Sequence, residues 1–122
     1  MLIIKPFDKR DIVQNTSEYS NLFSLREASF GITDIEWSAM ILADATTDSN
    51  SITISMEKTF DGVNFATGVA ILTTTDIGDG NPDYVAFNMG YPAPMCRFKA
   101  TENNNGAIVG LQLYVCIPTV TN

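Results

Sequence analysis

Two alternating segments that flank an Asn-Gly pair constrain the fold of this chain most. The first segment covers residues 96–102, the second covers residues 107–117, and Asn105-Gly106 lies between them. Such a pattern is the strongest short-range signal for a β-hairpin, because Asn and Gly accept the positive φ angles of the tight turn. Residues 51–65 repeat the pattern around Asp61-Gly62. The chain is therefore predicted to consist mostly of antiparallel sheet.

Further alternating segments are separated by turn-forming residues at intervals of about 8–12 residues, which is typical of a sandwich or barrel. The clearest are residues 35–42, 69–74 and 84–88, and a shorter strand is predicted at Leu22–Arg26. With 122 residues, 45% of them hydrophobic, the chain is long enough to bury one core without staples. The predicted fold is all-β, a single antiparallel β-sandwich of jelly-roll or Ig-like type with about eight strands.

The predicted organisation is an arm followed by one domain. Residues 1–10 are expected to form an N-terminal arm or edge strand, and residues 11–122 the β-sandwich domain. The first six residues, Met-Leu-Ile-Ile-Lys-Pro, hold three apolar residues before a Lys-Pro break, which is too short for a signal peptide. We therefore expect synthesis in a cytoplasm.

Side-chain parity divides the last two segments into a buried face and an outer face. Cys96, Phe98 and Ala100 share one face of the first segment, and alternate positions from Val109 to Ile117 share an apolar face of the second. The two apolar sets are expected to meet in the core, because a slip by one residue would expose both. Cys116 has the opposite parity, so we predict two free thiols rather than a disulfide. The predicted core residues are Trp37, Ile52, Ile54, Phe98, Leu111 and Leu113.

The charge balance argues against nucleic-acid and membrane partners. Seven Lys and Arg stand against fourteen Asp and Glu, which gives a net charge of −7. A phosphate backbone would be repelled, and Arg97 and Lys99, which share a strand face, are too few to form a basic groove. No apolar run approaches the ~18 residues of a membrane span. The low charged content of 17% fits a subunit of an assembly, and equally a β-rich chain that uses Thr, Ser and Asn as polar residues.

The sequence offers no clear catalytic group. It contains no histidine, which is the commonest general base and metal ligand. Two carboxylate pairs, Asp34 with Glu36 and Asp79 with Asp83, could in principle act as a hydrolytic pair, but solvated surface acids explain them more simply. We expect no catalytic residues, no cofactor and no enzymatic activity.

An acidic loop is the best candidate for a small ligand. Asp79, Asn81 and Asp83 stand at alternate positions, as the oxygen ligands of calcium loops do. The sixth position of that pattern is Tyr84 instead of Gly, and the twelfth is Gly90 instead of Glu. The same residue types form turns without any metal, so a calcium loop and a plain turn both remain open.

Aromatic residues give the alternative function, a carbohydrate-binding β-sandwich module with or without that calcium loop. Trp37 shares the apolar face of its segment and is predicted to lie in the core. Tyr114 is predicted to be a partly buried surface group beside Gln112, Arg97 and Lys99. The aromatic residues that could form a sugar platform are Trp37, Tyr84, Tyr91 and Tyr114.

Two stretches resemble small virion structural proteins of tailed bacteriophages. Residues 51–65 are similar to the strand, Asp-Gly turn, asparagine and aromatic of that family, although the family usually has Ser and a small polar residue at Thr59-Phe60. Residues 96–101 and 111–115, joined by the Asn-Gly turn, resemble its closing hairpin. The resemblance implies a capsid decoration (cement) or head–tail accessory subunit without enzymatic activity. It implies a homo-oligomer in the virion, with copies of itself and a major capsid or tail protein as partners.

Apolar residues outside the predicted core are the expected interface. Leu2, Ile3 and Ile4 lead the chain, and against a neighbour they could add a strand or fill a groove. Met40 and Leu42 lie on the outer face of their strand, where an isolated sandwich would carry polar residues. The alternative is that the arm folds back within one chain and covers Met40 and Leu42.

Overall fold

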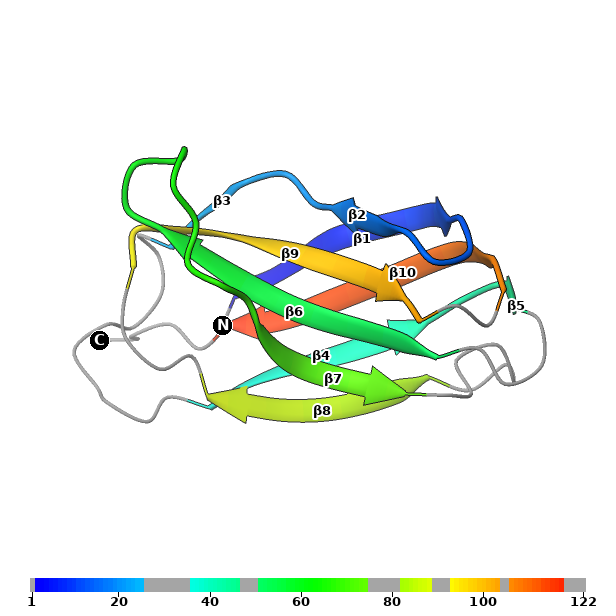
Figure 1. Cartoon of the computed structure of the whole chain (residues 1–122). Helices are drawn as coiled ribbons and strands as arrows, with labels where there is room; N and C mark the ends of the chain where they lie inside the picture. Colours follow the sequence, from blue (N-terminus) through cyan, green and yellow to red (C-terminus); the bar gives the residue numbers. More distant parts are fainter. Residues whose placement is uncertain are drawn as a thin grey trace.

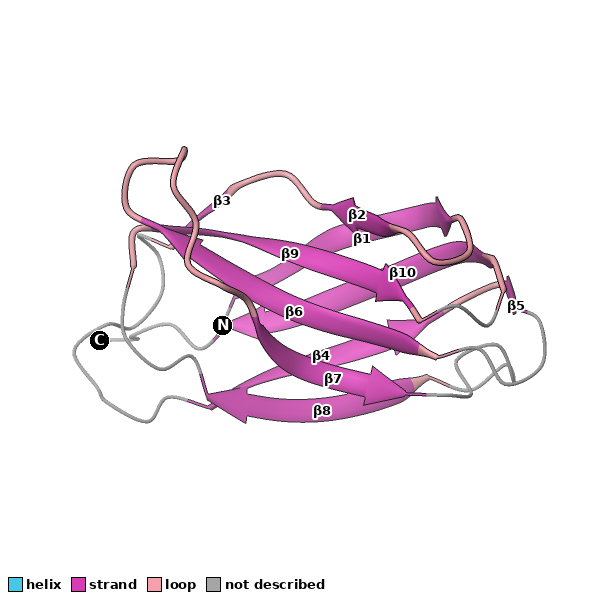
Figure 2. Cartoon of the chain, viewed as in Figure 1, coloured by secondary structure: helices cyan, strands magenta, loops and turns pink. Residues whose placement is uncertain are grey.

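The fold of the described residues consists of strands and loops only (Figure 2). The computed structural model describes residues 2–25, 36–46, 51–74, 82–88, 93–103 and 106–117. In chain order the strands are β1 (Leu2–Ile12), β2 (Ser17–Tyr19), β3 (Phe23–Ser24), β4 (Glu36–Leu42), β5 (Ala45–Thr46), β6 (Ile52–Thr59), β7 (Val69–Thr74), β8 (Asp83–Asn88), β9 (Met95–Glu102) and β10 (Ile108–Ile117). None of the described segments is a helix that could cross a membrane.

The strands form two antiparallel sheets that pack face to face, as predicted for a β-sandwich (Figure 1). Sheet A has the order β1-β10-β4-β8, with β5 beside β10. Sheet B has the order β2-β9-β6-β7, with β3 beside β9. Strand β3 lies within the strand predicted at Leu22–Arg26. The two-residue strand β5 was not predicted, because so short a segment shows no alternation.

The predicted hairpin between the last two segments is wrong. Strand β9 pairs with β2, β3 and β6 in sheet B, whereas β10 pairs with β1, β4 and β5 in sheet A. The connection between β9 and β10 therefore crosses from one sheet to the other. Alternation shows which face of a strand is buried, but it does not show which strand lies beside it. The apolar faces of the two strands meet in the core, as predicted, but they meet across the sandwich. The other predicted hairpin does form, since β6 pairs with β7 and Thr59 bridges Phe65.

The core lies between the sheets. All six predicted core residues are buried, and none exposes more than 1% of its surface. The other large, fully buried side chains of the described residues are Phe7, Ile12, Leu25, Ile41 and Ile108. Cys96 is buried in this core, Cys116 lies on the outer side of β10, and both cysteines are free, as parity predicted.

One residue of the predicted core face is on the wrong side. Val109 is 45% exposed, whereas Ile108 is fully buried. Gly110, between Val109 and the buried Leu111, has a φ of 67°, a left-handed conformation that shifts the alternation by one residue. Ile108 and Leu111 therefore both point into the core.

The N-terminal segment is an edge strand of sheet A. Residues 2–12 form β1, which pairs with β10 of the same chain. The register of this pairing shifts three times between Ile4 and Ile12, Pro6 lacks an N–H donor, and Lys9 has a positive φ of 57°. Such irregularities hinder the addition of a further strand. The β1 edge is therefore poorly suited to pair with a strand of another chain.

Candidate functional site

The outer face of sheet A brings apolar side chains from four strands into two rows. Strand pairing places Tyr114 of β10 opposite Met40 of β4, and Met40 opposite Tyr84 of β8. The second row continues from Ile3 to Cys116, Ser38 and Ala86, again through direct pairing partners. Side chains in a strand point alternately to the two faces of the sheet. The residues before and after each member of this set lie on the core-facing side, so the set itself lies on the outer face.

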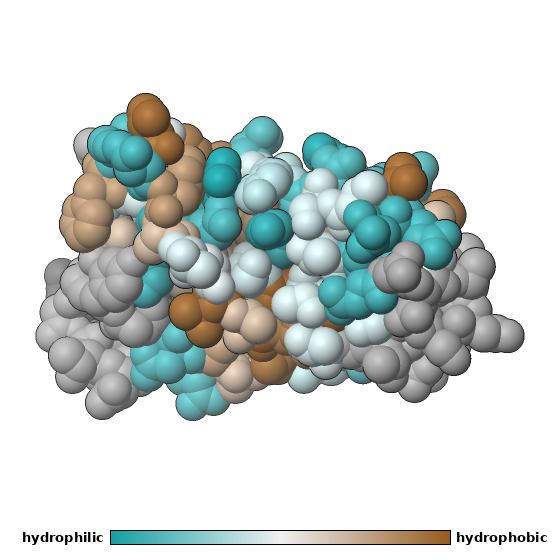
Figure 3. All heavy atoms as spheres, viewed as in Figure 1, coloured by the Kyte–Doolittle hydropathy of each residue, from teal (hydrophilic) through white to brown (hydrophobic). Residues whose placement is uncertain are grey.

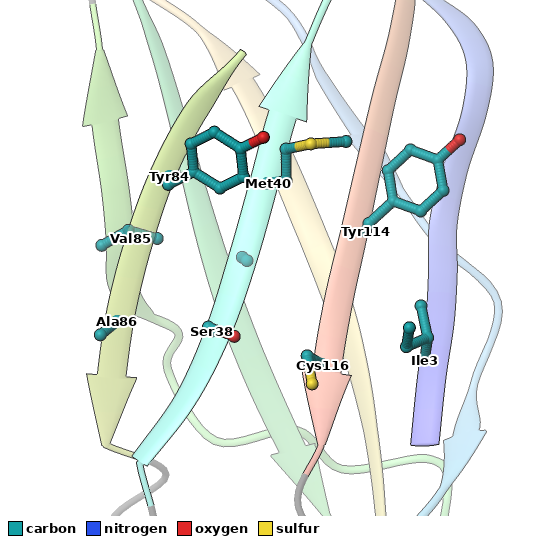
Figure 4. A pocket seen from close by; sticks show the side chains of 9 residues that line it. Ile3, Ser38, Met40, Tyr84, Val85, Ala86, Tyr114 and Cys116 are labelled. Carbon is teal, nitrogen blue, oxygen red and sulfur yellow. The ribbon is translucent and has the colours of Figure 1, made fainter. Parts of the chain in front are cut away.

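These residues line a shallow groove of about 540 Å³ (Figure 4). Figure 4 shows the Met40 side chain between the two tyrosine rings, with the smaller Ser38 and Cys116 below. Tyr84 is 72% exposed and Ile3 is 62% exposed, so the ends of the groove are large apolar groups in water. We call the set Ile3, Met40, Tyr84, Ala86, Tyr114 and Cys116 the A face.

An ion pair lies at the edge of the A face. The Lys5 ammonium is 4.7 Å from the centre of the Tyr114 ring and 2.8 Å from an Asp8 carboxylate oxygen. Hydrogen bonds to Asp8 and Tyr114 raise the pKa of Lys5 above its ordinary value. The Tyr114 hydroxyl donates to Gln112 Oε1 at 3.3 Å. The β1 side of the groove is therefore polar and carries the Lys5–Asp8 ion pair.

The structure divides the five residues that the sequence analysis assigned to an interface. Ile3 and Met40 both line the groove, two strands apart. Leu2 and Ile4 instead pack against the core, because they alternate with Ile3 on β1. Leu42 is half-buried and pairs with Gln112 of β10. The arm lies beside β10 and does not cover Met40.

Tyr84, Ala86, Tyr114 and Cys116 are residues of the A face that the interface prediction missed. The signal that could have found them is the parity of β8 and β10, which places these four residues on the outward side of their strands. Tyr84 and Tyr114 are candidates for a sugar platform in the sequence analysis, and not for an interface. The predicted position of Tyr114 beside Arg97 and Lys99 is wrong, because β9 and β10 belong to different sheets.

The outer face of sheet B has the opposite character. Hydroxyl groups pair across its strands, Ser17 with Thr101 at 2.8 Å and Thr53 with Thr73 at 3.3 Å. Arg97 donates to Glu57 at 2.7 Å. Figure 3 looks onto this face: hydrophilic and intermediate residues cover β6 and β9, and hydrophobic residues appear below them, toward β7 and β8. Sheet B therefore carries cross-strand polar pairs where sheet A carries the apolar groove.

Two aromatic rings at the outer face of sheet B stack on the Arg97 side chain. The Arg97 guanidinium carbon lies 4.3 Å from the Tyr19 ring centre and 3.6 Å from the Phe65 ring centre. Lys99 lies 5.6 Å from Tyr19. Such stacking on an arginine stabilises the surface locally and leaves the rings less available to a ligand. Trp37 is 1% exposed and packs edge-on against Phe87, so its predicted place in the core is confirmed.

The acidic candidates are only partly within the described residues. Asp34, Asp79 and Asn81 lie outside them. Asp83 begins β8 and pairs with Ile41, and Glu36 is exposed at the start of β4. Among the described residues, no group of three His, Cys, Asp or Glu side chains is placed to hold a metal ion.

Comparison with known proteins identifies the fold. No protein-family model and no curated protein matches the sequence. The structure is similar to the PBSX exported protein XepA, with a TM-score of 0.65, 10% identity and coverage of 99% of this chain and 38% of XepA. It is also similar to VP2 of the infectious bursal disease virus subviral particle, with a TM-score of 0.63, 9% identity and coverage of 95% and 32%.

A third similar structure contains an enzyme with an attached module. This is the CBM22-1–GH10 part of Clostridium thermocellum xylanase 10B in complex with xylohexaose, with a TM-score of 0.51, 9% identity and coverage of 97% of this chain and 29% of that chain. The chain thus spans about a third of the length of each of these three structures. At these identities the likenesses establish the β-sandwich fold alone.

Proposed function

We propose that this chain is a non-enzymatic structural subunit of a virion, a capsid decoration (cement) or head–tail accessory protein. It binds a capsid or tail protein through the A face. The observation that carries the proposal is the difference between the two outer faces, one lined by an apolar groove and the other by cross-strand polar pairs. The similarity in fold to VP2 of a viral particle supports it.

The composition of the A face suits protein binding. Tyr and Met are enriched where proteins meet, and charged residues are depleted from the centres of such contacts. Met40 lies between Tyr84 and Tyr114 in the groove, and the Lys5–Asp8 ion pair stands at its edge. Contiguous apolar surface of this kind on a monomer marks an interaction site. Burial of the two tyrosines would supply the anchor residues of the contact.

Carbohydrate binding is the second candidate, because Tyr84 and Tyr114 lie in one row on the same face. A sugar platform needs aromatic rings together with several polar groups that bind hydroxyls. Here Met40 stands between the rings. Besides the tyrosines, Ser38 is the one residue with a hydroxyl group among the described residues that line the groove. The surface therefore favours a protein partner.

The test compares two tyrosines on opposite faces. Particles are purified from cells that carry the gene, and the chain is quantified in them by mass spectrometry. Tyr84→Ser should reduce incorporation at least about tenfold, since loss of a central aromatic anchor weakens binding by that order. Tyr19→Ser, the same change on sheet B, should incorporate normally. Circular dichroism and melting of both variants control for folding.

Two results would contradict the proposal. One is equal incorporation of the two variants, or absence of the wild-type chain from particles. The other is a glycan that raises the melting temperature of the wild-type chain but not of Tyr84→Ser, because a ligand of the native state stabilises it by mass action. That result would make the carbohydrate-binding function the better one.

A further inference from the structure

The loop between β6 and β7 exposes large apolar side chains at one end of the sandwich. Phe60 is 70% exposed and Val63 is 78% exposed. In Figure 1 this loop projects beyond the sheets, and Figure 3 shows hydrophobic side chains at its tip. We call residues 60–65 the tip loop. It lies outside the A face and has no part in the proposed function.

The tip loop is held in one conformation by a single carboxylate. Asp61 Oδ1 accepts hydrogen bonds from Val63 N at 2.9 Å and Asn64 N at 2.8 Å, and Oδ2 accepts one from Asn64 Nδ2 at 2.7 Å. Thr59 Oγ1 donates to Asp61 Oδ1 at 3.1 Å and accepts from Gly62 N at 3.0 Å. These bonds hold the pKa of Asp61 well below its usual range. The loop is thus preorganised, which lowers the entropy cost of binding through its tip.

A hollow lies directly beside the tip loop. It has a volume of about 550 Å³. Leu22, itself 45% exposed, lies on the floor with Met95, and both side chains come within 3.8 Å of the position of a Cβ on Gly62. Phe60 forms one wall, so the projecting ring and the hollow are neighbours. The lining residues are Leu22, Phe23, Ser24, Phe60, Pro94 and Met95.

We infer that this end of the sandwich binds a second copy of the same chain through a two-fold contact. In that contact Phe60 of each copy enters the hollow of the other. A projection and a hollow side by side form a self-complementary surface, which is what an isologous interface requires. The two Phe60 rings would meet near the axis, where aromatic pairs pack favourably edge-on or offset.

The charges of the region fit a second copy. Two chains of net charge −7 repel each other, so they can meet only where charge is scarce or neutralised. The tip loop holds one charged residue, Asp61, whose ionised carboxylate accepts four hydrogen bonds from Thr59, Val63 and Asn64 and so needs no further donor from a partner. The hollow is lined by apolar residues, Pro94 and Ser24. This end of the molecule is therefore a place where copies can approach.

Sedimentation velocity over a concentration series tests the inference with matched valines. The wild-type chain should form dimers. Phe60→Ser and Val63→Ser should raise the dimer dissociation constant at least about tenfold. Val13→Ser is the control, because Val13 is also exposed, at 65%, but lies in the β1–β2 connection. It should leave the dissociation constant unchanged. All three positions are exposed, so the folded state tolerates the changes.

Cross-linking tests the two-fold geometry directly. In a Cys116→Ser background, and at a chain concentration above the dissociation constant measured for Phe60→Ser, Phe60→Cys should form a covalent dimer under mild oxidation, and Val13→Cys should remain monomeric. The inference is overturned if the wild-type chain stays monomeric up to about 1 mM, if Val13→Ser weakens the dimer as much as Phe60→Ser, or if Tyr84→Ser abolishes the dimer while Phe60→Ser does not. Incorporation of Tyr84→Ser into particles tests the proposed function separately, and neither outcome of that test bears on this contact.

Discussion

Cys96 and Cys116 differ in what surrounds their sulfur atoms. Burial raises the pKa of the Cys96 thiol to about 12, against a smaller opposing effect of Lys58, whereas Cys116 lines the groove of the A face. The thiolate is the reactive form, so Cys96 should be inert in the folded protein. We expect a thiol reagent at pH 8 to modify one group in the native chain and two in denaturant without reductant. Cys116→Ser should abolish the native reaction, and two fast native thiols would contradict the assignment.

Gly110 is the residue whose replacement should disturb the backbone most clearly. Its φ of 67° is unfavourable for other residues, and a Cβ there would collide with the Asp44 carboxylate, which pairs with Lys9. Gly110→Ala should lower the free energy of unfolding by about 2 kcal/mol, since the left-handed conformation alone costs about 1–2 kcal/mol. Urea unfolding measures this. Val109→Ala, at the exposed neighbour, is the control and should change stability by less than about 0.5 kcal/mol.

The same glycine shows why the sequence alone could not predict the buried face of every strand residue. Parity correctly placed Trp37, Phe98 and Cys96, because a strand with one buried face must alternate. It failed at Val109, because a single left-handed residue shifts the alternation without leaving a clear mark in the sequence. On the A face, parity could also have found Tyr84 and Cys116, but only with the knowledge that β8 and β10 both flank β4.

The two faces of strand β1 have different roles, one in stability and the other in the proposed binding. Leu2 and Ile4 pack against the core and β1 pairs with β10, whereas Ile3 faces outward in the groove. Deletion of residues 1–6 should lower the melting temperature, because it removes this pairing and exposes the edge of β10. Ile3→Ser in the whole chain should keep the melting temperature and reduce incorporation into particles.

Thermal melting with both readouts checks this pair of variants. A deletion that melts at the wild-type temperature would mean that the first residues contribute nothing to sheet A. The neighbours of β1 could not be predicted, because the arm and edge-strand alternatives bury the same apolar residues. The partners of β9 and β10 were mispredicted for a related reason. Turn-forming residues show that the chain reverses direction, but they do not show whether the next strand joins the same sheet or the other one.

The whole molecule is acidic, and this charge should govern how copies associate. At a net charge of −7 the repulsion between two chains is long-ranged in dilute salt and is screened beyond about 10 Å at 0.1 M. The contact at the tip loop is apolar, so salt should act on the repulsion alone. We expect the dimer dissociation constant to fall several-fold between about 0.05 M and 0.5 M sodium chloride. Phe60→Ser should remain monomeric in both buffers, and a dimer that weakens with salt would indicate ion pairs at the contact.

The central place of β10 in sheet A has a consequence for how the protein folds during translation. Strand β10 lies between β1 and β4, yet it is the last of the described strands to be translated. While the nascent chain grows, β4 and β8 can pair, but β1 has no neighbour, and Phe7 and Ile12 stay in water. The fold therefore closes late, through contacts between distant parts of the chain that form slowly. A stop codon anywhere before residue 108 would release a chain whose first strand never finds its partner.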